Sequence, residues 1–275
     1  MENKNVILLK HHPMNVKFTN PFYLNQTDNN DLSDYIVIDV TSRVTRDKEF
    51  MKEHPCFAKD LSPFFIGPVV SSDGVTAKIF EIFWQCGKVY PCHDNNGKPN
   101  EDFFKWRNEF YSKEVCSKEL MRHTCKSLGY EHKDTLYFAH FNKDTNSWEA
   151  LNYVDARKKV YFPEYVKLIY NSDSYKWIKS LVDSGKKVAL VDFDAINIYS
   201  SSAKAKAYQS YLNKCLKDKR TPRLTEEDFQ KLSTLKDLIS CPFLAVGHGV
   251  AIKSLLDGHL EVINGDVIDH TGILL

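Results

Sequence analysis

The chain has 275 residues, which is enough to bury one large hydrophobic core or two modest ones without help from metals or disulfides. Its 37 basic and 36 acidic residues leave a formal charge of +1, and this balance excludes a protein whose overall field attracts nucleic acid or membranes. The seven cysteines are odd in number and form no C-x-x-C pair, so they indicate neither a disulfide framework nor a zinc knuckle, and a reducing, cytoplasmic setting fits best.

The apolar stretches of the chain are short. None approaches the roughly 20 apolar residues that a membrane helix requires, and the apolar run near the amino terminus is too short for the core of a signal peptide. We therefore expect a soluble, cytoplasmic protein with no membrane partner, and the oligomeric state is left open. Aromatic residues make up 13% of the chain, and they are able to form a dense core or to stack on a flat ligand.

The first part of the chain predicts an extension, a strand, a turn and a helix. Residues 1–34 are rich in Asn, Asp, Pro and Thr, and this composition predicts an extension or a loosely packed arm. A β-branched run at residues 35–40 (Y-I-V-I-D-V) predicts a strand. A turn at residues 71–74 then leads into a helix over residues 79–90, with Thr76 as a candidate cap.

Amphipathic and apolar patterns continue to the end of the chain. They predict helices at residues 102–113, 114–127, 150–170, 174–184, 200–223, 225–240 and 251–256. They predict further strands at residues 136–141 and 187–193, and a strand pair within residues 260–275. Together the elements predict an α+β fold, a predominantly helical single domain over residues 35–275 with a few short strands.

The helix expected over residues 79–90 carries a narrow polar row. Glu81, Gln85 and Lys88 stand at i, i+4 and i+7 and share one helical face, while the rest of the helix is apolar. Burying a carboxylate and an ammonium group without a use for them costs free energy, so the row predicts a lined pocket. The alternative is that the row faces solvent or satisfies neighbouring backbone groups.

Residues 200–223 have a different character, because seven basic residues stand there against Asp218 alone. Such a surplus of positive charge along one helix is able to follow the phosphates of a nucleic acid. The alternative is a solvated helical arm. The residues of this predicted nucleic-acid-binding insertion are Lys204, Lys206, Lys214, Lys217, Lys219, Arg220 and Arg223.

One series of motif residues follows a recognisable order: Ser62, Phe64, Gly67, Pro68, Gly74, Glu81, Gln85 and Lys88. This series, which ends in E-x-x-x-Q-x-x-K, resembles the NADAR (NAD- and ADP-ribose-associated) family, whose usual form is an F-S-N-F-like run, a Gly turn and a helix opening E-H-x-x-Q-A-x-K. A weaker likeness continues through residues 153–192 and 247–256. The chain departs from the family pattern at Ile82, where the usual residue is His, and it lacks the family's D-x-x-W-G motif.

The resemblance implies a NADAR-like fold and an N-glycosidase that acts on nucleotide-like substrates. In that family these include riboflavin-pathway intermediates and ADP-ribose attached to guanine in DNA. Cleavage of a ribosyl C–N bond passes through a cation-like sugar, which calls for a carboxylate near the anomeric carbon and a donor for the departing base. We expect Glu81 to orient or deprotonate water. Asp192 or Asp194, at the end of the strand at residues 187–193, is the expected second carboxylate, or else caps the following turn.

The remaining candidates would hold the substrate. Gln85 would bond ribose hydroxyls, Lys88 would lie near a phosphate or a leaving-group atom, and Trp84 or Phe64 would stack on the base. Arg122 and Lys126 suit a diphosphate, or simply face solvent. The predicted substrate-binding residues are thus Phe64, Trp84, Gln85, Lys88, Arg122, Lys126 and His248.

A histidine and a group of cysteines are further candidates for binding. His248 stands between glycines, which allow a close approach to a ligand, although a buried, hydrogen-bonded histidine is the alternative. Cys116, His123 and Cys125 have poor spacing for zinc, so no metal is expected. No cofactor is expected either.

The predicted function is hydrolysis of the C1′–N bond of a nucleotide-derived substrate. That substrate is either a modified nucleotide in DNA, as in conflict between cells and phages, or an ADP-ribose-type conjugate. An alternative from another class is a non-catalytic module that binds ADP-ribose or a nucleotide. A third is a structural role, for which the polar row would be a coincidence.

Overall fold

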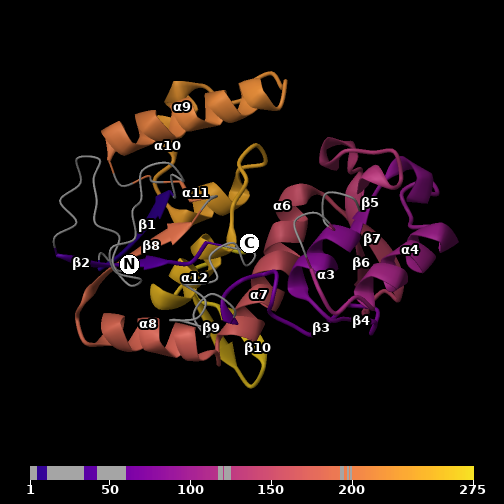
Figure 1. Cartoon of the computed structure of the whole chain (residues 1–275), viewed down its shortest axis with the longest axis horizontal. Coiled ribbons are helices and arrows are strands. Elements are labelled where there is room, and N and C mark those ends of the chain that lie inside the picture. Colours follow the sequence, from indigo (N-terminus) through magenta and orange to yellow (C-terminus); the bar gives the residue numbers. More distant parts are fainter. Residues whose placement is uncertain are drawn as a thin grey trace. The chain divides into compact units, whose positions relative to one another are not determined.

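The computed structural model describes residues 5–10, 34–41, 60–116, 120, 125–192, 195–196, 198 and 200–275. The chain divides into two compact units (Figure 1). Unit 1 combines Met1–Thr41 with Trp177–Leu275, and unit 2 is Ser42–Lys176. Both units mix helices with small sheets, which confirms a mixed helix-and-strand class. Among the described residues, no helix has both the length and the apolar character needed to cross a membrane.

Unit 1 contains a parallel sheet of three strands in the order β1, β8, β2. They are β1 (Val6–Lys10), β8 (Lys187–Asp192) and β2 (Tyr35–Asp39). Residues 188–190 of β8 are 0% exposed, and such a continuous apolar run is typical of the central strand of a parallel sheet. The composition of residues 1–34 predicted a loose arm, whereas β1 pairs with residues 188–192 of β8 because V-I-L-L extends the apolar sheet.

The carboxyl-terminal part of unit 1 covers this sheet. Helix α12 (His248–Leu256) packs against β1 and β8, and all of its residues are buried. A hairpin of β9 (Leu260–Ile263) and β10 (Asp266–Asp269) follows, which confirms the predicted strand pair. Its turn residues Asn264 and Gly265 both have positive φ, as a two-residue hairpin turn requires.

The other helices of unit 1 are α9 (Ser201–Lys217), α10 (Glu226–Lys231) and α11 (Leu235–Ser240), while α8 (Asp173–Asp183) spans the boundary between the units. The single helix predicted over residues 225–240 is therefore two. The chain leaves the helical conformation at Leu232, and Thr234 then forms a new capping box with Asp237.

Unit 2 contains two small antiparallel sheets. The first consists of β3 (Val69–Val70) and β4 (Thr76–Ala77), and the second has the order β5 (Lys88–Val89), β6 (Tyr137–Asn142) and β7 (Ser147–Leu151). Strand β7 was not predicted, because a helical pattern was read from residue 150 onward. The pairing with β6 decides its conformation, and the turn between them contains Asn146 at a φ of 50°.

The helices of unit 2 form an aromatic core with these sheets. Those whose bounds lie within the described residues are α3 (Phe80–Cys86), α4 (Glu101–Tyr111), α6 (Tyr153–Ala156), the π-helix η3 (Arg157–Tyr161) and α7 (Phe162–Ile169), with short 3₁₀ turns at η1 (Pro91–His93) and η2 (His132–Asp134). Pro163 is the second residue of α7 and follows the π-turn η3, so its missing N–H falls inside a continuous run of helical residues. The π-turn before it keeps residues 153–169 helical without a break.

Helix α3 is shorter than the sequence predicted. It ends at Gly87, and Lys88 and Val89 instead pair with β6. A Cβ atom on Gly87 would lie 2.2 Å from the ring of Phe138, so the glycine lets that ring pack against the end of the helix. At the other end Thr76 lies in β4 and is not the cap. The carbonyls of Ile66 and Pro63 accept hydrogen bonds from the N–H groups of Phe80 and Glu81.

Candidate functional site

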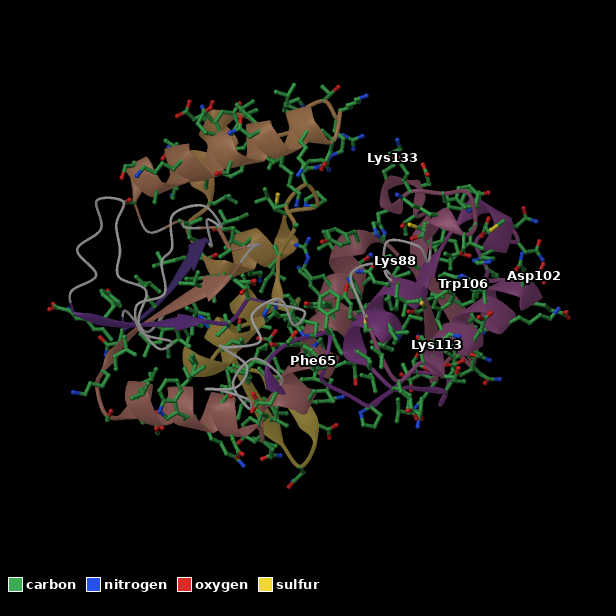
Figure 2. All side chains as sticks on the ribbon, viewed as in Figure 1. Phe65, Lys88, Asp102, Trp106, Lys113 and Lys133 are labelled. Atoms are coloured by element: carbon green, nitrogen blue, oxygen red, sulfur yellow. The ribbon has the colours of Figure 1, made fainter. Side chains whose placement is uncertain are left out.

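The predicted polar row exists in unit 2 as a chain of hydrogen bonds, although Lys88 stands on β5 and not on the helix (Figure 2). Gln85 Nε2 donates to Glu81 Oε1 over 2.7 Å, and Lys88 Nζ donates to Gln85 Oε1 over 2.6 Å. All three side chains are half-buried. The amide of Gln85 thus connects a carboxylate with an ammonium group and fixes the orientation of both.

The surroundings of the row are poorly solvated. Burial lowers the pKa of Lys88, and the Glu81 carboxylate offsets part of this change. Burial and, after it, the Glu81 carboxylate raise the pKa of the Cys116 thiol. Lys88 Nζ also lies 5.5 Å from the centre of the Trp84 ring. Charged groups in such a setting interact more strongly than they do in water, which suits a site that activates water or holds an anion.

The aromatic residues predicted to stack on a base are packed in the core of unit 2. Phe64 and Trp84 are each only 8% exposed. The Trp84 ring stacks on Phe138 at 5.0 Å between ring centres, and the edge of Tyr161 meets it at 4.9 Å. These contacts leave little of the Trp84 ring for a ligand.

Sequence reasoning missed a more accessible aromatic residue near the row. Tyr153, the first residue of α6, is 42% exposed, and its ring centre lies 6.5 Å from that of Trp84. Arg157 Cζ lies 4.4 Å from the Tyr153 ring, although Arg157 itself is only 1% exposed. The i, i+4 spacing of Tyr153 and Arg157 in Y-V-D-A-R is the signal that could have found them. Tyr153 therefore offers a ring surface for a flat ligand beside the row.

A cleft of about 710 Å³ lies elsewhere in unit 2. From α3 it is lined by Phe83 and Gly87 and by no member of the polar row, so it opens on the opposite face of that helix. Its charged side chains are largely paired with one another. Arg107 binds Asp73 at 2.6 Å, and Lys167 Nζ donates to Glu164 over 3.0 Å. The cleft is thus a hollow separate from the polar row, and several of its charged side chains are paired with one another.

Asp192 and His248 belong to unit 1, and Glu81 belongs to unit 2. Asp192 is 2% exposed, and its Oδ2 accepts a hydrogen bond of 3.0 Å from the N–H of Gly249 in the first turn of α12. His248 is 3% exposed and its Nε2 donates to the carbonyl of Val40. The contact of His248 corresponds to the alternative left open from the sequence, a buried, hydrogen-bonded histidine. Asp192 accepts from the first turn of α12 and not from the turn after its own strand, which was the alternative expected for it.

Replacing Asp192 with alanine is expected to destabilise the protein by about 1–3 kcal/mol, because the buried N–H of Gly249 loses its acceptor. Asp192→Asn keeps an acceptor oxygen at the same place, so it should lose less. Urea unfolding of both variants measures the difference. A pair of variants with unchanged stability and lost turnover would instead assign Asp192 to the reaction.

Lys126 is exposed, and Arg122, His123 and Asp194 lie outside the described residues. The residues predicted to bind nucleic acid lie on α9 and the segment after it in unit 1. Within the part of the chain that the structure describes, no group of three or more His, Cys, Asp or Glu side chains is arranged to hold a metal ion.

Glu81, Gln85, Lys88 and Tyr153 therefore form the candidate site that unit 2 offers by itself. The site combines a carboxylate, an ammonium group and an exposed ring within one compact unit. Comparison of the chain with protein-family models, with curated proteins and with solved structures found no match.

Proposed function

We propose that this protein is an N-glycosidase that hydrolyses the C1′–N bond of a nucleotide-derived substrate bound over the polar row of unit 2. The hydrogen-bonded chain from Glu81 through Gln85 to Lys88 carries this proposal. It holds a carboxylate and a cation in one orientation in a half-buried place. A NADAR-like fold belongs to the same proposal and is supported by the order of motif residues along the chain.

In the proposed reaction the C1′–N bond breaks and its electron pair passes to the base nitrogen, which takes up a proton from the solvent. A water oxygen bonds to C1′, and the proton that it gives up passes to Glu81, which then releases it to the solvent. Gln85 holds the Glu81 carboxylate in place through the 2.7 Å hydrogen bond. Lys88 binds a phosphate oxygen of the substrate, and Tyr153 stacks on its base.

The substrate is either an ADP-ribose-type conjugate or a modified nucleotide in DNA. Both contain a ribosyl C–N bond and phosphate groups, and so both match the carboxylate and the cation of the row. A reducing, cytoplasmic setting fits the proposal, because Cys86, Cys116, Cys125 and Cys215 are buried free thiols.

The experiment compares the wild-type protein with Glu81→Gln on two substrates, DNA that carries ADP-ribosylated guanine and free ADP-ribosyl nucleotides. Mass spectrometry of the released base or sugar is the measurement. We expect the variant to lose about 10²–10⁴-fold in turnover while binding and thermal unfolding stay close to wild type. Glu109→Gln, on an exposed side chain of α4, is the matched control and should keep full turnover.

The second candidate function is a module that binds a nucleotide without cleaving it. Glycosidases generally use two carboxylates, and Glu81 is the one carboxylate of the polar row, which favours this alternative. Wild-type protein that binds ADP-ribose but releases no product from either substrate would support it. In that case Glu81→Gln should leave the function unchanged, and Lys88→Met should weaken binding.

A further inference from the structure

Figure 1 shows helix α9, which belongs to unit 1. The basic residues at its carboxyl-terminal end and in the segment that follows form a cationic surface. From residue 214 to residue 223 the chain carries five basic residues and a single acidic one, Asp218. All five basic residues are exposed. We call this surface the α9 platform, and its residues are Lys214, Lys217, Lys219, Arg220, Arg223 and Phe243.

The helix dipole explains only part of this charge. Cations are favourable at the carboxyl end of a helix because that end carries roughly half a negative charge. A single lysine is enough to offset this partial charge. The single acidic residue of this stretch, Asp218, pairs with Arg220 at 3.0 Å. Five basic residues against one acidic residue leave a surplus of four positive charges over residues 214–223. At the start of α10, Glu227 pairs with Lys231 at 2.9 Å.

The backbone holds these side chains on a fixed frame. Lys219 has a φ of 51°, a left-handed conformation that ends α9, and the N–H of Arg220 donates to the carbonyl of Cys215 over 2.8 Å. The hydroxyl group of Tyr211 accepts the N–H groups of Arg223 and Leu224 over 2.8 and 3.3 Å. Binding of a ligand to these cations therefore costs less conformational entropy than it would if they stood on a flexible loop.

An aromatic ring accompanies the cations. Phe243 is 38% exposed, and Arg223 Cζ lies 5.6 Å from the centre of its ring. The guanidinium lies over the ring. The exposed part of this pair provides a stacking surface for an unpaired base, while the lysines bind the adjoining phosphates. In a duplex the bases are already stacked on each other, so this surface suits a single strand.

We propose that the α9 platform binds single-stranded nucleic acid. The occupant is a polyanion with flat bases, which matches the local charge and the exposed ring together. This binding is independent of the chemistry at Glu81, so it can be measured whether or not the protein cleaves a glycosidic bond.

The test measures fluorescence anisotropy of a labelled oligothymidylate of about 15 nucleotides with the full chain at several salt concentrations. We expect Lys217→Glu/Lys219→Glu to weaken binding at least about tenfold at low salt and to reduce the steepness of the salt dependence. Lys179→Glu/Lys186→Glu makes the same change in net charge on exposed residues of unit 1 and should retain the wild-type affinity. An equal loss of affinity in the two double variants would contradict the proposal that the α9 platform is the binding site.

Phe243→Ala tests the stacking contribution separately. It should weaken binding about fivefold or more and leave the salt dependence unchanged, because it removes no charge. Competition then identifies the ligand. Unlabelled oligothymidylate should displace the probe at a lower concentration than a duplex of equal length. Stronger displacement by polyglutamate or by anionic lipid vesicles would show that the platform serves another partner and would contradict the proposal.

Discussion

Replacing Lys253 with methionine is expected to destabilise the protein by about 3–5 kcal/mol. Lys253 lies on α12 and is 0% exposed. Its Nζ donates to Asp257 Oδ2 over 2.7 Å and to the carbonyl of Val6 over 2.6 Å. The side chain of Asp257 is also 0% exposed, so the substitution removes its cation in a place where water cannot replace it. The loss of the Val6 contact weakens the attachment of β1 as well.

Unfolding in urea, followed by circular dichroism, measures this effect. The chain contains a matched control, because Lys179 and Asp183 also form an i, i+4 pair at 2.8 Å, with side chains 49% and 59% exposed. Lys179→Met should change the stability by less than about 0.5 kcal/mol. Lys253→Met/Asp257→Leu should recover part of the loss, because no buried charge is then left alone. Similar losses in Lys253→Met and Lys179→Met would contradict the role given to burial.

Gly67→Ala is expected to destabilise unit 2 by about 2–4 kcal/mol. Gly67 has a φ of 155°, and a Cβ atom there would lie 2.2 Å from the carbonyl oxygen of Lys78. That oxygen belongs to the backbone and cannot turn aside as a flexible side chain can. The neighbouring Ile66 carbonyl accepts the N–H of Phe80 over 2.8 Å, so a shift at Gly67 would also disturb the start of α3.

Gly74 provides the control for this substitution. It also has a positive φ, 87°, but no atom lies within 4 Å of the place where its Cβ would be. Gly74→Ala should therefore cost only the conformational penalty of about 1 kcal/mol. Thermal unfolding of both variants gives the comparison, and turnover or ligand binding at the polar row shows whether α3 has moved. If Gly67→Ala were as stable as Gly74→Ala, the Lys78 carbonyl would be able to shift at little cost in free energy, and the prediction would be wrong.

Several elements could be predicted because their signals are local. The runs Y-I-V-I-D and K-V-A-L-V-D form β2 and β8, and T-E-E-D begins α10 with the capping box that its residues predict. The alternating carboxyl-terminal stretch forms a hairpin. In each case neighbouring residues contain both the conformational preference and the hydrogen-bonding groups that satisfy it.

The candidate site was predictable only in part. The spacing of Glu81 and Gln85 placed them on one helical face, and their side chains are hydrogen-bonded there. Tyr153 was missed, because its position beside Trp84 depends on how α6 and α3 pack and not on the residues around it. The exposure of the two rings also depends on this packing. The sequence cannot show that Trp84 is covered while Tyr153 is exposed.

By itself, the sequence determined the mixed helix-and-strand class, the strands β2, β6, β8, β9 and β10, the Thr225 cap of α10 and the pairing of a carboxylate with an amide at i, i+4. Only the tertiary structure decided that α3 stops at Gly87, that Lys88 joins a strand, and that Asp192 binds the N–H of Gly249. These outcomes depend on partners far along the chain, such as Phe138 beside Gly87. A residue's preference for a conformation is weak compared with the free energy of burying a ring or satisfying a buried polar group, so the distant partner decides.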